Sequence, residues 1–170
     1  MIAYDLVLLV HVLVGLVGFG SVAATGVLAY QARLGAAPSE RVLRYFRPGP
    51  NLAARALYLV PVLGLALVGM SGDRATLHQA WLLAASGLWL AAAIVARAVV
   101  WPAEATLQRL LAGQPEGARA PSQVPATPQV RATPQGSAGV WAAARRAERG
   151  AALVEVAYVA AFVLMVAQPH

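Results

Sequence analysis

The feature that most limits what this chain can fold into is a series of long apolar stretches almost free of charge. Leu6 to Ala32 contains no charged residue and a single histidine. A helix that crosses a bilayer needs roughly 20 mostly apolar residues, so this stretch predicts a first membrane span, retained rather than cleaved. Three further apolar stretches complete a predicted all-α, polytopic membrane protein, a four-transmembrane-helix bundle in one membrane domain, 1–170. The spans are expected at about 6–30, 52–72, 76–101 and 150–167.

The composition favours the same class of protein. Hydrophobic residues make up 59% of the chain and charged residues only 12%, whereas an average soluble domain carries roughly 25% charge. So few charges cannot cover a surface that faces water. All 13 basic residues are arginine, and together with the abundant Ala, Val, Leu and Gly this bias predicts a bacterial source. The sequence has no cysteine, which excludes a disulfide, a zinc-thiolate site or an iron–sulfur cluster within this chain.

The first connection between spans predicts a short helix. Ser39 is a helix-capping residue type, and Glu40–Arg47 follows it with alternating charged and apolar residues. We expect this helix to lie in the membrane interface, with Val42, Leu43 and Phe46 directed toward lipid.

The third connection predicts a linker. Residues 113–137 are rich in Pro, Gln, Ala and Gly, and they repeat Ala-Thr-Pro-Gln at 126–129 and 132–135. Such a stretch cannot bury enough apolar surface to offset the cost of ordering the chain, so a disordered cytoplasmic linker is expected. Helical extensions are expected on either side of it, at 103–111 and 140–149.

The arginines predict an orientation. Five lie in or beside the first connection and seven in or beside the third, whereas Arg74 alone lies on the opposite side. The positive-inside rule therefore places both large connections in the cytoplasm and both termini outside, in the inner (plasma) membrane of a bacterial cell. The same placement argues against nucleic acid as a partner, because these charges orient the chain and meet anionic lipid headgroups of the bilayer.

His11 is the first candidate for a functional residue, because an ionisable side chain inside a membrane is expensive to bury without a partner. A stripe of small residues continues from it at helical spacing, through Gly15, Gly18, Val22 and Gly26. Small residues at this spacing let a second helix approach closely, so His11 is expected to face a helix contact. Three alternatives stay open: a neutral histidine bonded to a neighbouring hydroxyl or carbonyl, a haem or metal ligand, and a proton-handling group.

The predicted orientation also gathers soft ligands toward one side of the bundle. Imidazole and thioether groups suit copper and haem iron. The candidate cofactor and metal-binding residues are therefore His11, Met70, His78 and Met165, with haem b or copper as the group they would hold. Ordinary apolar packing of the methionines is the competing interpretation.

Glu155 interrupts the fourth apolar stretch. A carboxylate inside the membrane costs much less beside a guanidinium, and Arg97 and Arg55 are expected at a similar depth. We therefore predict a structural ion pair between Glu155 and one of these two arginines, which would set the register of the helices.

Short apolar motifs at both ends carry a family resemblance. Leu8-Leu9-Val10-His11-Val12-Leu13 is followed by Gly15 and Gly18-Phe19-Gly20, and the chain closes with Phe162-Val163-Leu164-Met165-Val166-Ala167-Gln168-Pro169. These segments resemble the predicted bacterial integral membrane proteins grouped as domain of unknown function twenty-two sixty-nine. More distantly, the chain is similar to four-helix membrane proteins of the copper-resistance D type. The second resemblance implies a copper or haem role for His11.

Two classes of function follow from these features. The first is a structural or accessory subunit of a membrane assembly, with a membrane protein or a second copy of the chain as partner. The alternative is a haem- or copper-binding membrane redox protein that uses His11. No phosphate-binding glycine loop, HExxH motif or nucleophile elbow occurs in the sequence, so no catalytic residues are predicted and an enzyme is not expected.

Overall fold

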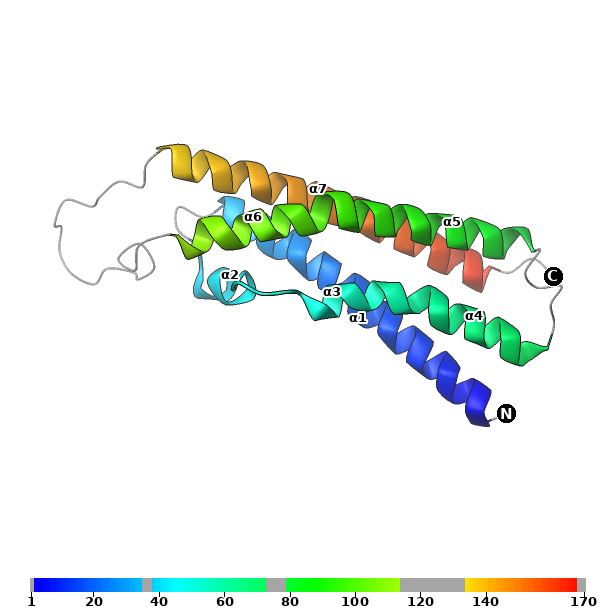
Figure 1. Ribbon diagram of the computed structural model, residues 1–170. Helices are drawn as coiled ribbons and strands as arrows, with labels where there is room; N and C mark the ends of the chain where they lie inside the picture. The colour runs from blue at the N-terminus through cyan, green and yellow to red at the C-terminus, as the bar shows by residue number, and fades with distance from the viewer. Residues whose placement is uncertain (1, 35–37, 73–78, 114–133, 168–170) are drawn as a thin grey trace.

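Four long apolar helices dominate the computed structural model, which describes residues 2–34, 38–72, 79–113 and 134–167 (Figure 1). These residues form helices and connecting turns, without a strand among them. The segments long and apolar enough to cross a membrane are Ile2–Leu34, Leu52–Ser71, Ala80–Ala112 and Ala138–Val166. The all-helical class and the four spanning-length helices predicted from sequence are confirmed.

Two of these segments, the second and the third, are divided by local changes of helix type. The elements in chain order are α1 (Ile2–Leu34), α2 (Glu40–Tyr45), α3 (Leu52–Arg55), the 3₁₀ turn η1 (Ala56–Tyr58), α4 (Leu59–Ser71), α5 (Ala80–Val95), the π-helical turn η3 (Ala96–Val100), α6 (Trp101–Ala112) and α7 (Pro134–Val166). Figure 1 shows α2 and α6 at one end of the bundle and the N-terminus and the end of α4 at the other. We call the first the arginine-rich end and the second the opposite end.

Small residues allow α1 and α7 to pack closely as an antiparallel pair. A Cβ atom placed on Gly26 would lie 2.7 Å from Cβ of Ala151, so only glycine fits there. About two turns earlier on α1, Phe19 stacks on Tyr158 of α7, with 4.0 Å between the ring centroids. The glycine stripe predicted from sequence therefore forms a helix contact.

A proline in the second long segment leaves a backbone carbonyl free to bond to the third segment. Pro61 has no N–H to give to the carbonyl of Leu57, four residues earlier. That carbonyl accepts a hydrogen bond from Nε1 of Trp89 instead, at 3.1 Å. The 3₁₀ turn η1 lies immediately before this break, and Gly18 of α1 approaches its backbone so closely that an added Cβ would lie 2.8 Å from N of Leu57.

The third segment contains the π-helical turn η3. Pro102 cannot donate to the carbonyl of Ala98 and its ring crowds that carbonyl, which favours a wider turn just before it. Gly150 of α7 packs against this turn, since an added Cβ would lie 2.9 Å from side-chain atoms of both Val99 and Val100.

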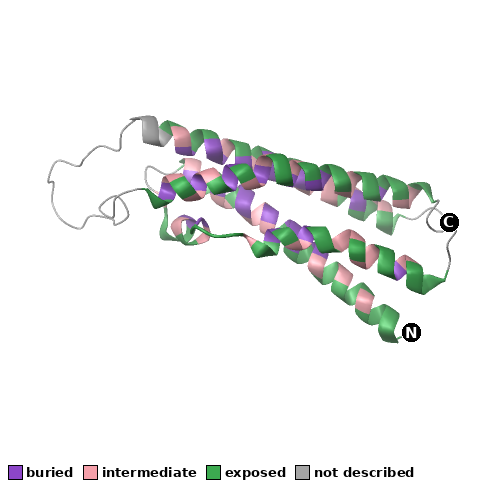
Figure 2. Cartoon of the chain, in the orientation of Figure 1, coloured by how far each residue is buried: buried purple, intermediate pink, exposed green. Residues whose placement is uncertain are grey.

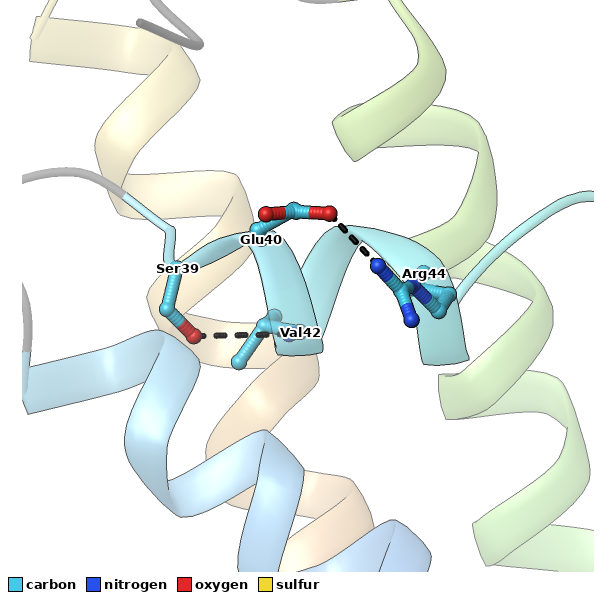
Figure 3. Close-up of polar contacts among 4 residues, drawn as sticks. All are labelled: Ser39, Glu40, Val42 and Arg44. Atoms are coloured by element: carbon cyan, nitrogen blue, oxygen red, sulfur yellow. Dashed lines mark hydrogen bonds and ion pairs between the residues drawn. The ribbon is translucent and has the colours of Figure 1, made fainter. Parts of the chain in front are cut away.

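The short helix α2 forms as predicted but faces the protein. Ser39 Oγ accepts a hydrogen bond from the N–H of Val42 at 3.4 Å, and Arg44 pairs with Glu40 at 2.6 Å on the exposed side (Figure 3). Val42 and Phe46 are 0% and 1% exposed. The prediction that they point toward lipid is wrong, because α1, α6 and α7 extend beyond the predicted spans and offer them an apolar core.

The buried core is concentrated toward the arginine-rich end and the middle of the bundle (Figure 2). One cluster joins α1, α2, α6 and α7, and a second joins α1, α3, η1, α5, η3 and α7. The first cluster contains Ala29, Ala32, Val42, Phe46, Ala103, Leu107, Leu111, Val140, Ala143, Ala144 and Ala147. The second contains Phe19, Val22, Ala54, Leu57, Ala92, Ala93, Ala96, Val100, Ala151 and Val154.

The first part of α1, residues 2–14, has a different environment. None of these residues is buried. Val7, His11 and Val14 are partly buried and lie along one face of the helix. Figure 1 shows this part of α1 diverging from α5 and α7 toward the N-terminus. We call residues 2–14 the apolar arm. Its exposed large side chains are Ile2, Tyr4, Leu6, Leu8, Leu9, Val10, Val12 and Leu13.

The end of the predicted linker, residues 134–137, overlaps helix α7. Helix α7 begins at Pro134, so the last residues of the stretch 113–137 are helical in their backbone. Proline is tolerated in the first turn of a helix, where its missing N–H would have no partner. The rest of that stretch, 114–133, lies outside the described residues.

Candidate functional site

Polar side chains from four parts of the chain meet at the arginine-rich end. Ser21 and Thr25 come from α1, Tyr45 from α2, Asn51 from the cap of α3, and Glu104 from α6. Thr25 is 0% exposed and Glu104 is 5% exposed. We call these five residues the polar cluster. Buried polar groups are costly unless they are hydrogen-bonded, so their bonding decides whether the cluster stabilises the fold.

The hydroxyl of Tyr45 lies at the centre of this cluster. It is 2.7 Å from Oγ1 of Thr25 and 3.0 Å from the carbonyl oxygen of Ser21. Thr25 Oγ1 is also 3.0 Å from that carbonyl. Each hydroxyl has one proton, so one of the two donates to the carbonyl of Ser21 and the other closes the bond between Thr25 and Tyr45.

Asn51 uses both ends of its amide. Its Oδ1 accepts from the N–H of Ala54 at 3.2 Å, which caps α3, and from Oγ of Ser21 at 3.1 Å. Its Nδ2 donates to the hydroxyl of Tyr45 at 3.2 Å and to Oε1 of Glu104 at 3.2 Å. The cluster is thus a connected network that fixes α1, α2, α3 and α6 relative to one another.

Sequence reasoning missed this network. Asn51 directly precedes an apolar run, which is the position of a helix cap, and Glu104 follows Trp101-Pro102 at the start of a helix. Each residue gave a local signal. Their meeting depends on the close approach of α3 and α6, which no pattern within either segment reveals.

His11 faces α4, as the glycine stripe predicted. An added Cβ on Gly64 would lie 3.5 Å from Cε1 of the His11 ring, so the ring packs against the backbone of α4. Its Nδ1 is buried and has no hydrogen-bond partner in the part of the chain that the structure covers. The interpretation of His11 as a histidine bonded to a neighbouring hydroxyl or carbonyl therefore stays a prediction.

The predicted group of soft ligands is only partly described. Met70 and Met165 are 45% and 37% exposed, and His78 lies outside the described residues. Among residues 2–34, 38–72, 79–113 and 134–167, no group of three or more His, Cys, Asp or Glu residues could hold a metal ion. Within the described ranges, His11 therefore belongs to no such group.

Glu155 does not form the predicted ion pair within the described chain. Its Oε1 is buried without a hydrogen-bond partner there. Arg55 and Arg97 line an open pocket to which α7, the helix of Glu155, contributes no residue. A similar expected depth is not sufficient for an ion pair, because the side chains must also face one another.

A different carboxylate of α7 is paired. Glu148 Oε2 lies 3.0 Å from Nη2 of Arg33 near the end of α1. The Arg33 guanidinium also lies over the rings of Tyr30 and Trp141, at 5.2 and 5.9 Å from their centroids. This pair clamps α1 to α7 at the arginine-rich end, which is the role that sequence reasoning gave to Glu155.

Comparison with known proteins adds no relative. No protein-family model matches the chain, and neither the curated proteins nor the solved structures include a match.

Proposed function

We propose that the chain is a bacterial inner-membrane protein and a structural or accessory subunit of a larger membrane assembly. The four apolar segments support insertion into a membrane, since exposed leucine side chains are unfavourable in water but favourable in the hydrocarbon core of a bilayer. The arginine distribution supports an orientation with the arginine-rich end in the cytoplasm and both termini outside. The resemblance to the domain of unknown function twenty-two sixty-nine family also supports this proposal, because that family consists of predicted bacterial integral membrane proteins.

The observation that carries the accessory role is the contrast between the two ends of the bundle. The arginine-rich end is fixed by the polar cluster and by two apolar cores. The apolar arm has no buried residue and touches the bundle along one narrow stripe. A helix with one anchored half and one free apolar half presents a ready surface to the helix of a partner.

Site-specific photo-crosslinking in native membranes tests this role. A photoreactive amino acid replaces Leu9 on the apolar arm, which is 55% exposed. The matched control replaces Leu153 of α7, which is 61% exposed. We expect one discrete protein adduct from position 9 and lipid adducts alone from position 153.

The mass of the adduct identifies the partner. An adduct of twice the chain's mass indicates a second copy, and any other discrete mass indicates a different membrane protein. Lipid adducts alone at both positions would contradict the accessory role, because the arm would then face only the bilayer.

A haem- or copper-binding redox protein is the second candidate function. The Nδ1 of His11, which has no hydrogen-bond partner among the described residues, favours it, because a ligand nitrogen must have a free lone pair. Absorption spectroscopy and metal analysis of gently purified protein, wild type beside His11→Ala, test this candidate. A Soret band or bound copper that the variant loses supports it, and a colourless, metal-free, folded wild type rejects it.

A further inference from the structure

A pocket of about 460 Å³ lies open where the second and third long segments meet. Two short stretches line it, one from α3 and η1 and one from η3 and α6. The lining residues are Arg55, Tyr58, Arg97, Trp101, Pro102 and Ala105. Two of the six carry a guanidinium group and none carries a carboxylate, so the pocket is positively charged.

Neither guanidinium is neutralised inside the pocket. The two ion pairs found in the described parts of the chain join other residues. Glu104 interacts electrostatically with Arg55, but it is buried, bonded to Asn51 and absent from the lining. Two like charges that face one cavity repel each other, and an anion between them replaces this repulsion by two attractions.

Trp101 forms an aromatic side of the pocket. Its indole Nε1 is buried and has no hydrogen-bond partner among residues with a described position, although the N–H of a buried tryptophan usually finds one. The ring is held edge-on to Tyr58, with centroids 5.5 Å apart and an angle of 74°. The two rings therefore give the pocket an aromatic wall beside the two guanidinium groups.

The backbone around Arg97 is also unusual. Arg97 lies within η3, the π-helical turn formed before Pro102. Such turns occur often at functional sites because the extra residue changes the direction of nearby side chains. The packing of Gly150 against Val99 and Val100 supports this turn from α7, so the position of Arg97 is fixed by the fold.

We propose that this pocket binds a phosphate group, held between Arg55 and Arg97. The planar guanidinium fork matches phosphate oxygens in pairs. The phosphate belongs either to the headgroup of an anionic lipid or to a small soluble phosphate. The site is independent of the accessory role proposed above.

Two binding measurements on the purified full chain distinguish these sources. Native mass spectrometry counts phosphatidylglycerol and phosphatidylcholine retained from mixed nanodiscs, and equilibrium dialysis measures radiolabelled inorganic phosphate. The pocket variant is Arg55→Gln with Arg97→Gln. Its matched control is Arg41→Gln with Arg146→Gln, which removes the same charge from two exposed arginines outside the pocket.

We expect the wild type to bind one of the two probes and the pocket variant to lose about tenfold or more in affinity. The control variant should bind as the wild type does. The variant Arg55→Lys with Arg97→Lys keeps the charge but loses the fork, so its affinity should fall between the two. Retention of phosphatidylglycerol alone identifies a lipid headgroup, and binding of inorganic phosphate identifies a soluble source.

Three results would overturn the proposal. The wild type binds neither probe, the pocket variant binds as well as the wild type, or the control variant loses as much affinity as the pocket variant. In the last case net charge alone would account for binding. Circular dichroism of each variant checks that helix content is retained, which is expected because all four arginines are exposed.

Discussion

Asn51 Nδ2 donates a hydrogen bond to Oε1 of Glu104 at 3.2 Å, and this bond joins the cap of α3 to α6 across 53 positions of sequence. The same amide caps α3 through Oδ1. One side chain thus begins the second long segment and ties it to the third. The polar cluster is therefore the feature that fixes the arginine-rich end.

Replacement of Asn51 by alanine should destabilise the protein strongly. The change removes a helix cap and leaves buried oxygens of the polar cluster without donors, at a cost of about 2–4 kcal/mol. Unfolding in mixed detergent micelles, followed by circular dichroism, measures the loss. The control is Gln108→Ala, which removes an exposed hydrogen bond to the carbonyl of Gly49 and should change stability little. Equal effects of the two variants would show that the cluster does not stabilise the fold.

Thr25 and Tyr45 should be energetically coupled, because their hydroxyls share one bond and one acceptor. A double-mutant cycle with Thr25→Val and Tyr45→Phe isolates this coupling. We expect an interaction energy of roughly 1–2 kcal/mol, with each single variant leaving a partner unsatisfied. Additive losses in the cycle would mean that the two hydroxyls act independently, contrary to the geometry.

The sequence predicted the parts of this fold that depend on local composition or on the period of one helix. Long apolar runs located the four long segments, and the glycine stripe identified the face of α1 that packs on α7 at Gly26. Ser39 and Glu40 located α2.

The parts that failed depend on how separate helices are rotated about their axes. An approximate depth along the membrane normal could be estimated from the sequence, and it suggested a pair between Glu155 and either Arg97 or Arg55. The sequence did not show which face of α7 meets which helix. The structure pairs Glu148, not Glu155, with an arginine, Arg33 of α1. The prediction that Val42 and Phe46 point toward lipid failed for a related reason, since their direction depends on how the extensions of α6 and α7 are placed around α2.

Gly18 and Gly20 should respond oppositely to the same substitution. An alanine at position 18 would place its Cβ 2.8 Å from the backbone N of Leu57. The Cβ of an alanine at position 20 would have no such atom within 4 Å. Gly18→Ala should therefore cost about 1–3 kcal/mol by overpacking, and Gly20→Ala should be neutral or stabilising by up to about 1 kcal/mol. Parallel unfolding titrations check the pair. Similar effects at both positions would argue against the close approach of α1 to η1.

Glu148 and Glu155 provide the sharpest test, because the same isosteric change should have opposite signs seven residues apart on α7. Glu148→Gln weakens a partly exposed ion pair with Arg33, so we expect a loss of about 1 kcal/mol. Glu155→Gln removes the charge from a carboxylate with one buried, unpartnered oxygen. It should raise stability by roughly 0–2 kcal/mol, because no described partner offsets the cost of burying that charge. Unfolding of both variants under identical detergent conditions makes the comparison. A loss at Glu155 as large as that at Glu148 would mean that Glu155 has a stabilising partner, and the loss should then disappear in a double variant that also removes that partner.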